Sequence, residues 1–409
     1  MKKYPKYIIA LITCAAMLGG CSGTARIDYA DTYVAEQDSQ ENYIDYSNEF
    51  YYASSGENYY FTRNSFLYAI NKQTQECHPL CNKSDCLHDQ EETYALREKC
   101  SAFINPTDDK VVYNNGFIYY CIYDYDYDKD GIYRMADSIC RLSVDTLMRE
   151  TIYTTTDYAI YNFRVHRGYI YMEASAYVTD EGGGSRESSQ GDAELLRVAI
   201  DSQDEAEVFV PYNKYRKKYK YFVVRETKLY GNHLFLKIGY TKNGKSQKTI
   251  LNVNLGTKEI KDIGNNLPLD DASMLTIFND KLVFNGNQTK IYECDFDGNN
   301  LKEVLDCSEI IGWYNRFDPR SNDGKTLFIS IAYVNPEDSY DFTKSKNVIF
   351  CNEKYEYTVR EMPIEYLADV GFDEDFFIYQ KDKEDNDPIY LIDKNDLTMR
   401  KVYDFSDDE

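Results

Sequence analysis

Leu275–Cys307 reads LTIFNDKLVFNGNQTKIYECDFDGNNLKEVLDC, four short apolar segments separated by polar turns. The apolar segments are rich in β-branched and aromatic residues, which favour strands. Asn279-Asp280 and Asp295–Asn300 are strong turn signals, because Asp, Asn and Gly tolerate a positive φ. The stretch therefore predicts a small four-stranded sheet, with strands expected at 275–278, 281–284, 290–294 and 301–305.

This pattern recurs along the chain at intervals of about 40 to 60 residues, the span of propeller blades. The third strand of each unit is predicted at Phe66–Lys72, Ile139–Asp145, Leu195–Asp201, Thr249–Leu255, Lys290–Asp295, Asn347–Asn352 and Pro388–Asp393. A sheet of this size cannot bury both of its faces by itself, so each unit needs a neighbour on either side. The sequence predicts an all-β fold, a β-propeller of seven four-stranded blades, with six or eight blades as alternatives.

The repeats occupy most of the 409 residues, which predicts a single propeller domain over residues 49–409. The formal net charge of -23 argues against nucleic acid as a partner and against electrostatic attraction to an anionic bilayer. Tyrosine is the dominant aromatic residue, with 41 copies against 20 phenylalanines and one tryptophan. Packing of half-buried strands explains this abundance, and a carbohydrate-binding surface is the alternative.

The N-terminus has the features of a secretory signal. Three lysines lie among the first six residues, and the apolar stretch Tyr7–Leu18 is too short to span a bilayer. Leu18–Cys21, LGGC, follows and resembles a bacterial lipobox, in which the cysteine is acylated after cleavage. The alternative is an ordinary secretory signal with a chance cysteine.

The lipobox resemblance implies a lipoprotein signal peptide at residues 1–20 and lipidation of Cys21, for example with palmitate. Residues 21–48 are polar and mostly acidic, and are expected to form a flexible tether. The protein is therefore expected at the bacterial cell membrane, facing outside the cytoplasm, with the lipid anchor as its contact with the membrane.

A cysteine-rich loop is predicted at about residues 76–105, between the first and second blades. It reads ECHPLCNKSDCLHD over Glu76–Asp89 and contains Cys77, Cys81, Cys86, His88 and Cys100. One interpretation is a disulfide staple, with three possible pairings of the four cysteines. A second is a zinc site formed by four thiolates, or by three thiolates and His88. A redox-active thiol is the third.

The loop, the lipobox and the repeats together resemble uncharacterised lipid-anchored lipoproteins of Gram-positive bacteria with TolB-like propellers. These proteins carry a PLC-x4-C-x-H…C element, matched by Pro79-Leu80-Cys81, Cys86, His88 and Cys100. The resemblance covers most of the chain and implies an architecture but no known activity. Cys77 has no counterpart in the element.

An acidic segment at residues 124–131, DYDYDKDG, is a candidate calcium loop. Asp126, Asp128 and Asp130 lie on alternate residues, and Asp137 falls at the position of the twelfth ligand of such a loop. Carboxylates spaced in this way can converge on Ca²⁺. A solvated acidic hairpin is the alternative.

Lys214–Lys220, KYRKKYK, is the one basic run in the chain. By itself it suggests binding of phosphate or of a polyanion, such as an anionic wall polymer. The alternative is an exposed loop before the fourth blade.

Other cysteines are expected within the blades. Cys121 and Cys140 fall on successive strands, where they are expected side by side. Cys294 and Cys351 are expected to be buried free thiols.

No catalytic motif was found: the chain has no G-x-S-x-G elbow, no H-E-x-x-H and only four histidines. Trp313 is the only tryptophan, which does not fit quinoprotein or sialidase propellers. The predicted function is a non-catalytic binding or scaffolding propeller for an extracellular protein, peptide or glycan. The alternative is a metal- or redox-linked sensor or accessory protein built on the Cys/His cluster, and an unrecognised hydrolase is the third possibility.

Overall fold

The structure is a computed structural model, and it describes most of the chain from residue 30 onward. The described residues are 30–34, 37–38, 52–84, 86, 88, 94–106, 110–127, 133–179, 185–187, 193–200, 205–269, 274–286, 289–309, 315–321, 326–333, 347–364, 371–372, 375–380 and 388–404. The predicted signal peptide, Cys21 and most of the predicted tether lie outside these residues.

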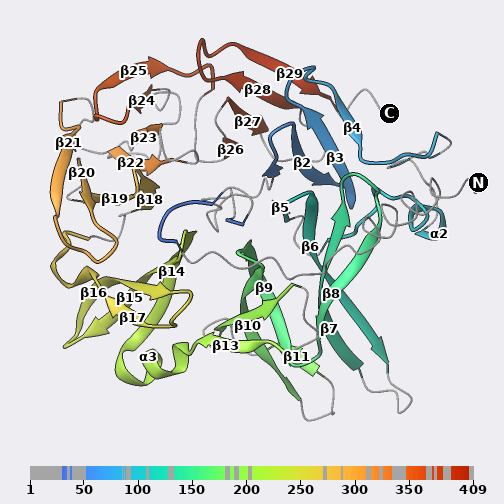
Figure 1. Cartoon of the computed structure of the whole chain (residues 1–409), viewed down its shortest axis with the longest axis horizontal. Coiled ribbons are helices and arrows are strands. Elements are labelled where there is room, and N and C mark those ends of the chain that lie inside the picture. Colours follow the sequence, from blue (N-terminus) through green and yellow to red (C-terminus); the bar gives the residue numbers. More distant parts are fainter. Residues whose placement is uncertain are drawn as a thin grey trace, which may run out of the picture.

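Seven antiparallel sheets form a ring around a common centre (Figure 1). Six sheets have four strands, and the sheet of blade 3 has a fifth short strand. The described residues also form two short helices, α2 (Tyr94–Arg97) and α3 (Tyr212–Lys218), and the 3-10 helix η3 (Gly264–Asn266). No helix in this part of the chain has both the length and the apolar character that a membrane span requires. The predicted all-β, seven-bladed propeller is confirmed.

Each blade is formed by consecutive strands. Blades 1 to 3 consist of β1 (Tyr52–Ser54), β2 (Asn58–Arg63), β3 (Phe66–Asn71) and β4 (Cys77–Pro79); β5 (Val111–Asn114), β6 (Phe117–Tyr127), β7 (Tyr133–Ser143) and β8 (Arg149–Thr155); β9 (Tyr158–His166), β10 (Tyr169–Thr179), β11 (Ser185–Glu187), β12 (Glu194–Ala199) and β13 (Glu207–Val210). Blades 4 and 5 consist of β14 (Lys220–Tyr230), β15 (His233–Lys242), β16 (Lys245–Asn254) and β17 (Ile260–Asp262); β18 (Leu275–Phe278), β19 (Lys281–Gly286), β20 (Lys290–Cys294) and β21 (Lys302–Asp306). Blades 6 and 7 consist of β22 (Asn315–Arg320), β23 (Leu327–Tyr333), β24 (Asn347–Cys351) and β25 (Tyr357–Glu361); β26 (Gly371–Phe372), β27 (Phe376–Gln380), β28 (Ile389–Asp393) and β29 (Met399–Tyr403).

Apolar side chains cover both faces of the sheets, as β15 illustrates. Leu234, Leu236 and Ile238 pack toward blade 3, whereas Phe235 packs toward blade 5. The alternation follows from the two-residue period of a strand. The described residues form seven buried apolar clusters, one at each junction between neighbouring blades. Burial of this surface is the main term that stabilises the ring.

The ring closes through packing between complete blades. All four strands of blade 7 lie between Gly371 and Tyr403, and blade 1 begins and ends within its own four strands. Tyr59 and Phe61 of blade 1 pack with Ile378 of blade 7 in the closing cluster. Within the described residues, therefore, neither closing sheet takes a strand from the other end of the chain.

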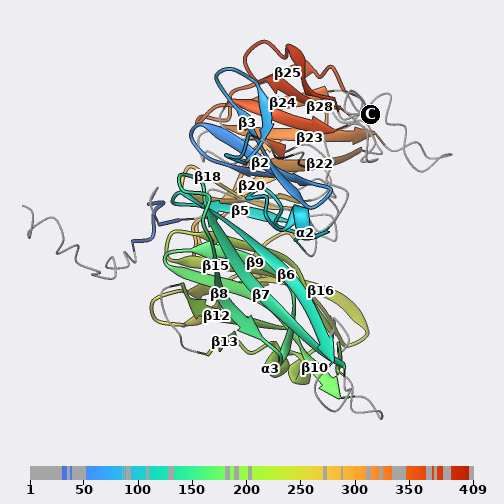
Figure 2. The same cartoon turned by 90° about the vertical axis from the view of Figure 1, so that its right-hand side faces the viewer.

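The N-terminal segment, Ala30–Val34 with Gln37–Asp38, packs near the centre of one face of the ring (dark blue in Figures 1 and 2). Arg167 holds it there, with an Nη2 to Asp38 Oδ2 distance of 3.1 Å. Arg167 also donates to the carbonyls of Ala30 and Thr32 at 2.8 and 2.9 Å. Both charged side chains are at most 1% exposed. This part of the predicted tether is thus packed against the propeller.

Gly231 allows the N-terminal segment to approach closely. Its φ is +53°, and a Cβ at this position would lie 2.2 Å from the carbonyl oxygen of Asp31. His166 is fully buried beside the segment, with its Nε2 2.8 Å from the Gly231 carbonyl oxygen. Burial lowers the pKa of His166, so the ring is expected to be neutral at neutral pH.

The ring has two faces, and each is defined by the turns between strands that lie on it. The β9–β10 and β14–β15 turns, which contain Arg167 and Gly231, contact the N-terminal segment, and we call this side the N-terminal face. Strands alternate in direction, so the turns between the second and third strands lie on the opposite side, the distal face. The long β6–β7 hairpin extends away from the N-terminal segment (Figure 2).

Replacing Arg167 by Ala is expected to lower the free energy of unfolding by about 3 to 5 kcal/mol, because it removes the arginine that pairs with the buried Asp38 carboxylate. Urea unfolding measures the loss. Lys261→Ala is the matched control, since Lys261 and its partner Glu259 are about 60% exposed and should contribute less than about 1 kcal/mol. Equal losses in the two variants would contradict the assigned role of Arg167.

Candidate metal centre

The cysteine-rich loop connects blade 1 to blade 2 and returns on itself. Cys81 lies two residues after the end of β4, and Cys86 and His88 follow it. Helix α2 lies between His88 and Cys100, and Cys100 follows its end by three residues. The loop therefore brings residues from both of its ends to one place.

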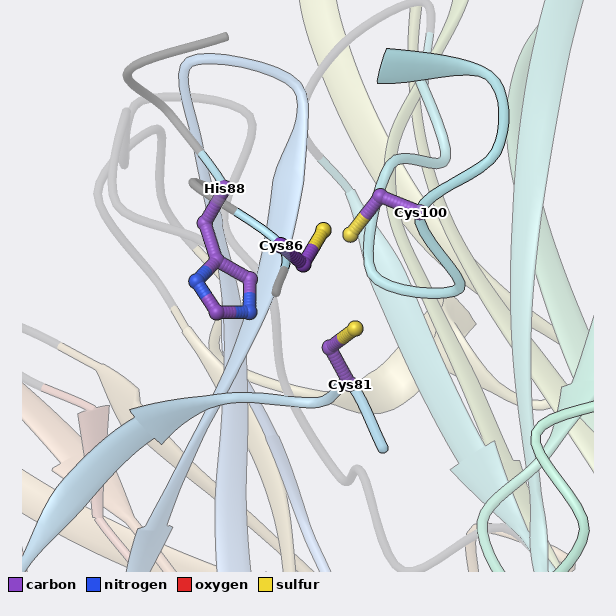
Figure 3. A group of neighbouring side chains, drawn as sticks. All are labelled: Cys81, Cys86, His88 and Cys100. Carbon is purple, nitrogen blue, oxygen red and sulfur yellow. The ribbon is translucent and has the colours of Figure 1, made fainter. Parts of the chain in front are cut away.

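Cys81, Cys86, His88 and Cys100 converge on a common point (Figure 3). Each side chain offers one ligand atom, and these four atoms all lie within 4.8 Å of one another. Cys100 is fully buried, whereas the other three side chains are half-buried. Three thiols and an imidazole form a donor set that suits zinc.

Backbone hydrogen bonds fix both ends of the loop. Leu80 N donates to the Leu67 carbonyl at 2.8 Å, and Leu67 N donates to the Ala102 carbonyl at 2.7 Å. Arg149 of blade 2 donates to the carbonyls of Phe103 and Cys100 at 2.6 and 3.2 Å. The ligand-bearing segments are thus held against blade 1 from both sides.

The cluster also packs on the junction that closes the ring. Cys100 belongs to the apolar cluster between blades 7 and 1, and Cys81 and Cys86 contact this cluster. An ion bound here would therefore cross-link the loop next to the closing junction.

The thiols of Cys81 and Cys100 have opposite pKa shifts. Burial raises the pKa of Cys81, but hydrogen bonds from Lys83 N, Ser101, His88 and Cys100 outweigh this effect and lower it to about 6. Burial raises the pKa of Cys100, and the neighbouring Cys81 thiolate raises it further. The cluster therefore stabilises one thiolate without a metal ion.

The structure brings together four of the five loop residues that the sequence singled out. Cys77 is the exception: it lies on β4, paired with Ile70, and is not part of the convergent group. No disulfide joins Cys77, Cys81, Cys86 or Cys100 within the described residues. The four convergent residues are also those that match the PLC-x4-C-x-H…C element.

Lys83 and Ser101 also contact Cys81, although neither was predicted as a site residue. Lys83 N lies 3.5 Å from the Cys81 sulfur, and Ser101 hydrogen bonds to the same sulfur. Lys83 lies two residues after Cys81, and Ser101 directly follows Cys100. This proximity in sequence was the only indication that they belong to the site.

The structure contradicts the predicted calcium loop for Asp137. β6 continues to Tyr127 and β7 begins at Tyr133, so Asp137 lies four residues, about 13 Å, along β7 from that end. The Asp137 carboxylate instead accepts hydrogen bonds from Ile160 N and Tyr177 Oη of blade 3, at 2.6 and 2.7 Å. The backbone of Asp126 lies opposite Arg134, whereas Asp128 and Asp130 lie outside the described residues.

The remaining cysteines lie within the blades. Cys140 pairs with Tyr120, and Cys121 pairs with Ile139, so the two thiols face different junctions and not each other. The prediction that Cys121 and Cys140 lie side by side is therefore wrong, because Cys121 pairs with the residue next to Cys140. Cys294 and Cys351 are buried free thiols, as predicted, and burial raises the pKa of each to about 12.

Comparisons with known proteins are limited to structure. No family model matches the sequence, and no curated protein matches it. TolB from Acinetobacter baumannii is similar at 12% identity and a TM-score of 0.35, over 86% of this chain and 77% of that one. Pyrococcus horikoshii acylaminoacyl peptidase is similar at 9% identity and a TM-score of 0.47, over 93% of this chain and 55% of that one. A chain of a nidogen/laminin complex is similar at 10% identity and a TM-score of 0.37, over 69% of this chain and 92% of that one. None of these likenesses transfers an activity or a partner to this chain.

In metal-free protein, Cys81 is expected to react with iodoacetamide with a half-maximal rate near pH 6, because the thiolate is the nucleophile. An ordinary thiol would titrate near pH 8.5. Tandem mass spectrometry of the labelled peptides distinguishes the sites, and Cys100, with its raised pKa, is the internal control. A Cys81 profile centred at pH 8.5 or above would contradict the described hydrogen bonds.

Proposed function

We propose that this protein is a lipid-anchored, non-catalytic binding propeller that is displayed outside the cytoplasm of a bacterium. The observation that carries the proposal is the N-terminal segment docked on one face of the ring. Eight residues separate Cys21 from Ala30, so the nine Cα–Cα steps between them reach at most about 32 Å. Lipidated Cys21 would thus hold the N-terminal face toward the membrane.

The opposite, distal face would then be presented to the surroundings. Its hairpins differ in length from blade to blade, and such variable turns on a rigid scaffold are where binding residues concentrate. The expected partner is an extracellular protein, peptide or glycan.

Anchoring is tested by expressing the full chain in a bacterium fed labelled palmitate. The wild-type protein should incorporate the label, and Cys21→Ala should not, because the acylated thiol is gone. Cys14→Ala is the matched control and should still be labelled, since Cys14 lies within the predicted signal peptide. Label in Cys21→Ala, or none in the wild-type protein, would refute the anchor.

We further propose that Cys81, Cys86, His88 and Cys100 hold a Zn²⁺ ion that fixes the loop. With Zn–S bonds of about 2.3 Å and Zn–N bonds of about 2.1 Å, a tetrahedral site of three sulfurs and one nitrogen places its ligand atoms about 3.6 to 3.8 Å apart. The observed limit of 4.8 Å requires only a small contraction. Four protein ligands leave no position for water or substrate, so the ion would be structural.

A redox-linked role is the second candidate, because the low pKa of Cys81 beside two further thiols favours disulfide exchange. In that case the reduced protein would be metal-free, and its thiols would oxidise reversibly. The disulfide staple predicted from the sequence would give a metal-free protein without reactive thiols in the loop.

Elemental analysis of the purified protein is expected to give one zinc per chain, lost on substitution Cys86→Ser and retained in Cys77→Ser. The second variant removes a thiol of the same loop that lies outside the cluster. Chelation of the ion should lower the melting temperature, since metal binding contributes to folding free energy. A metal-free wild-type protein would exclude the zinc site, and titration of its thiols would then separate the redox role from the staple.

A further inference from the structure

The N-terminal segment is not part of the architecture of the ring. The seven sheets that the structure describes are built from strands between Tyr52 and Tyr403. No described residue of the segment belongs to any of the seven apolar clusters. Asp38 is the only one of these residues that is buried. The ring therefore buries its apolar surface without the segment.

The ring holds the segment mainly through the backbone of the segment. Arg167 donates from Nη1 to the Ala30 carbonyl and from Nη2 to the Thr32 carbonyl, at 2.8 and 2.9 Å. Its backbone N donates to the Gln37 carbonyl at 2.6 Å. The side chain of Thr32 is itself exposed. Contacts to carbonyl groups use atoms that every peptide has, so they do not select the side chains of this particular segment.

Asp38 is the one side chain of the segment that the ring recognises deep inside the site. Its carboxylate accepts hydrogen bonds from Arg167 Nε and Nη2 at 2.5 and 3.1 Å, and lies 3.5 Å from His166 Nε2. A guanidinium fork on a carboxylate is a strong and directional contact. The site therefore selects one carboxylate and three main-chain carbonyls.

The segment is acidic as a whole. Residues 30–38 read ADTYVAEQD, with three acidic side chains and no basic one. Asp31 also contacts the ring, with its Oδ1 3.1 Å from His233 Nε2, but this carboxylate is 69% exposed. An exposed pair of this kind contributes little free energy. Among the acidic residues that the structure describes here, Asp38 is thus the anchor of the segment.

Two other polar surfaces give weaker evidence of a ligand. The basic run Lys214–Lys220 is largely helical, as α3, and is not the loop expected from the sequence, but the lysines of α3 are exposed on the surface. A groove of about 740 Å³ between blades 6 and 7 contains Arg360. This arginine already donates to the carbonyls of Lys394 and Asn395 at 3.0 and 2.9 Å.

We propose that the centre of the N-terminal face is a peptide-binding site, which the N-terminal segment of the same chain occupies until an acidic peptide of another protein displaces it. The ligand would present a carboxylate to Arg167 and main-chain carbonyls to the donors that now hold Ala30, Thr32 and Gln37. Because the segment belongs to the same chain, a separate peptide competes at a disadvantage. Its apparent affinity falls with the fraction of molecules in which the site is open.

Displacement of the segment would also make the site accessible beside a membrane. This consequence rests on the proposed anchor at Cys21. With the segment released, 31 Cα–Cα steps connect Cys21 to Tyr52, a reach of at most about 110 Å. The ring could then move away from the membrane, and its N-terminal face would add a second binding surface to the distal face.

The test uses the full mature protein in detergent and a fluorescently labelled synthetic peptide of residues 30–38 with blocked ends, with anisotropy as the readout. The wild-type protein should bind the peptide weakly, because its own segment occupies the site. Asp38→Ala should bind it at least about tenfold more tightly, since the charge-assisted contact that holds the segment is lost. Asp31→Ala makes the same change at an exposed position of the segment and should bind like the wild type.

Three further measurements complete the test. A peptide that carries the Asp38→Ala change should not bind to the Asp38→Ala protein, and the double variant Asp38→Ala/Arg167→Gln should not bind the original peptide. Hydrogen exchange in the segment should be faster in Asp38→Ala than in Asp31→Ala, which verifies the release of the segment. Unfolding curves verify that each variant is folded.

Several results would overturn the inference. These are equal peptide affinity of Asp38→Ala and Asp31→Ala, equal binding of the two peptides, and full binding by the double variant. A wild-type dimer that Arg167→Gln dissociates would also overturn it, because the occupant would then be the segment of a second copy of this chain. No result depends on palmitate labelling or zinc content, so the inference can fail while the proposed function stands.

Discussion

Every blade of this protein has two apolar faces, and neither can be left in water. A sheet of four short strands cannot cover itself, so each blade depends on the two beside it. The seven buried clusters, one at each junction, are the direct expression of this requirement. Ring closure then follows, because an open array would expose one apolar face at each end. The connecting loops differ in length, but this has little effect on the burial of the blade faces.

Buried polar contacts add specificity to the apolar junctions. Asp137 of blade 2 accepts hydrogen bonds from blade 3, and Glu226 of blade 4 accepts one from Leu275 N of blade 5 at 2.9 Å. Arg167 and Asp38 do the same for the N-terminal segment. Such contacts contribute little net stability, but misplacing them is costly, because a buried charge would lose its partner. They therefore favour one alignment of neighbouring blades over others.

The strand positions were predictable from the sequence because polarity patterns and turn residues are local. The register of the strands was not predictable. Cys121 and Cys140 were assigned to the correct strands, but they are offset by one residue in the pairing, so their thiols face different junctions. Helix α3 was missed because its first turn is capped from another blade, where Glu194 accepts a hydrogen bond from Asn213 N at 3.1 Å. The side chains that form the Cys/His cluster were visible in the sequence. Cys77 lies outside this cluster because its strand, β4, pairs with β3. This pairing is not evident from the sequence pattern.

Because every blade is continuous in sequence and none borrows a strand within the described part of the chain, each sheet can form as soon as its own residues are available. A chain that folds from its N-terminus can add blades in order, and each new blade buries the exposed face of the one before it. Blade 1 must wait with one apolar face uncovered until β26–β29 arrive from the far end of the chain. We therefore expect the rate of completing the ring to depend on the C-terminal blade, and truncations there to be more damaging to solubility than their length suggests.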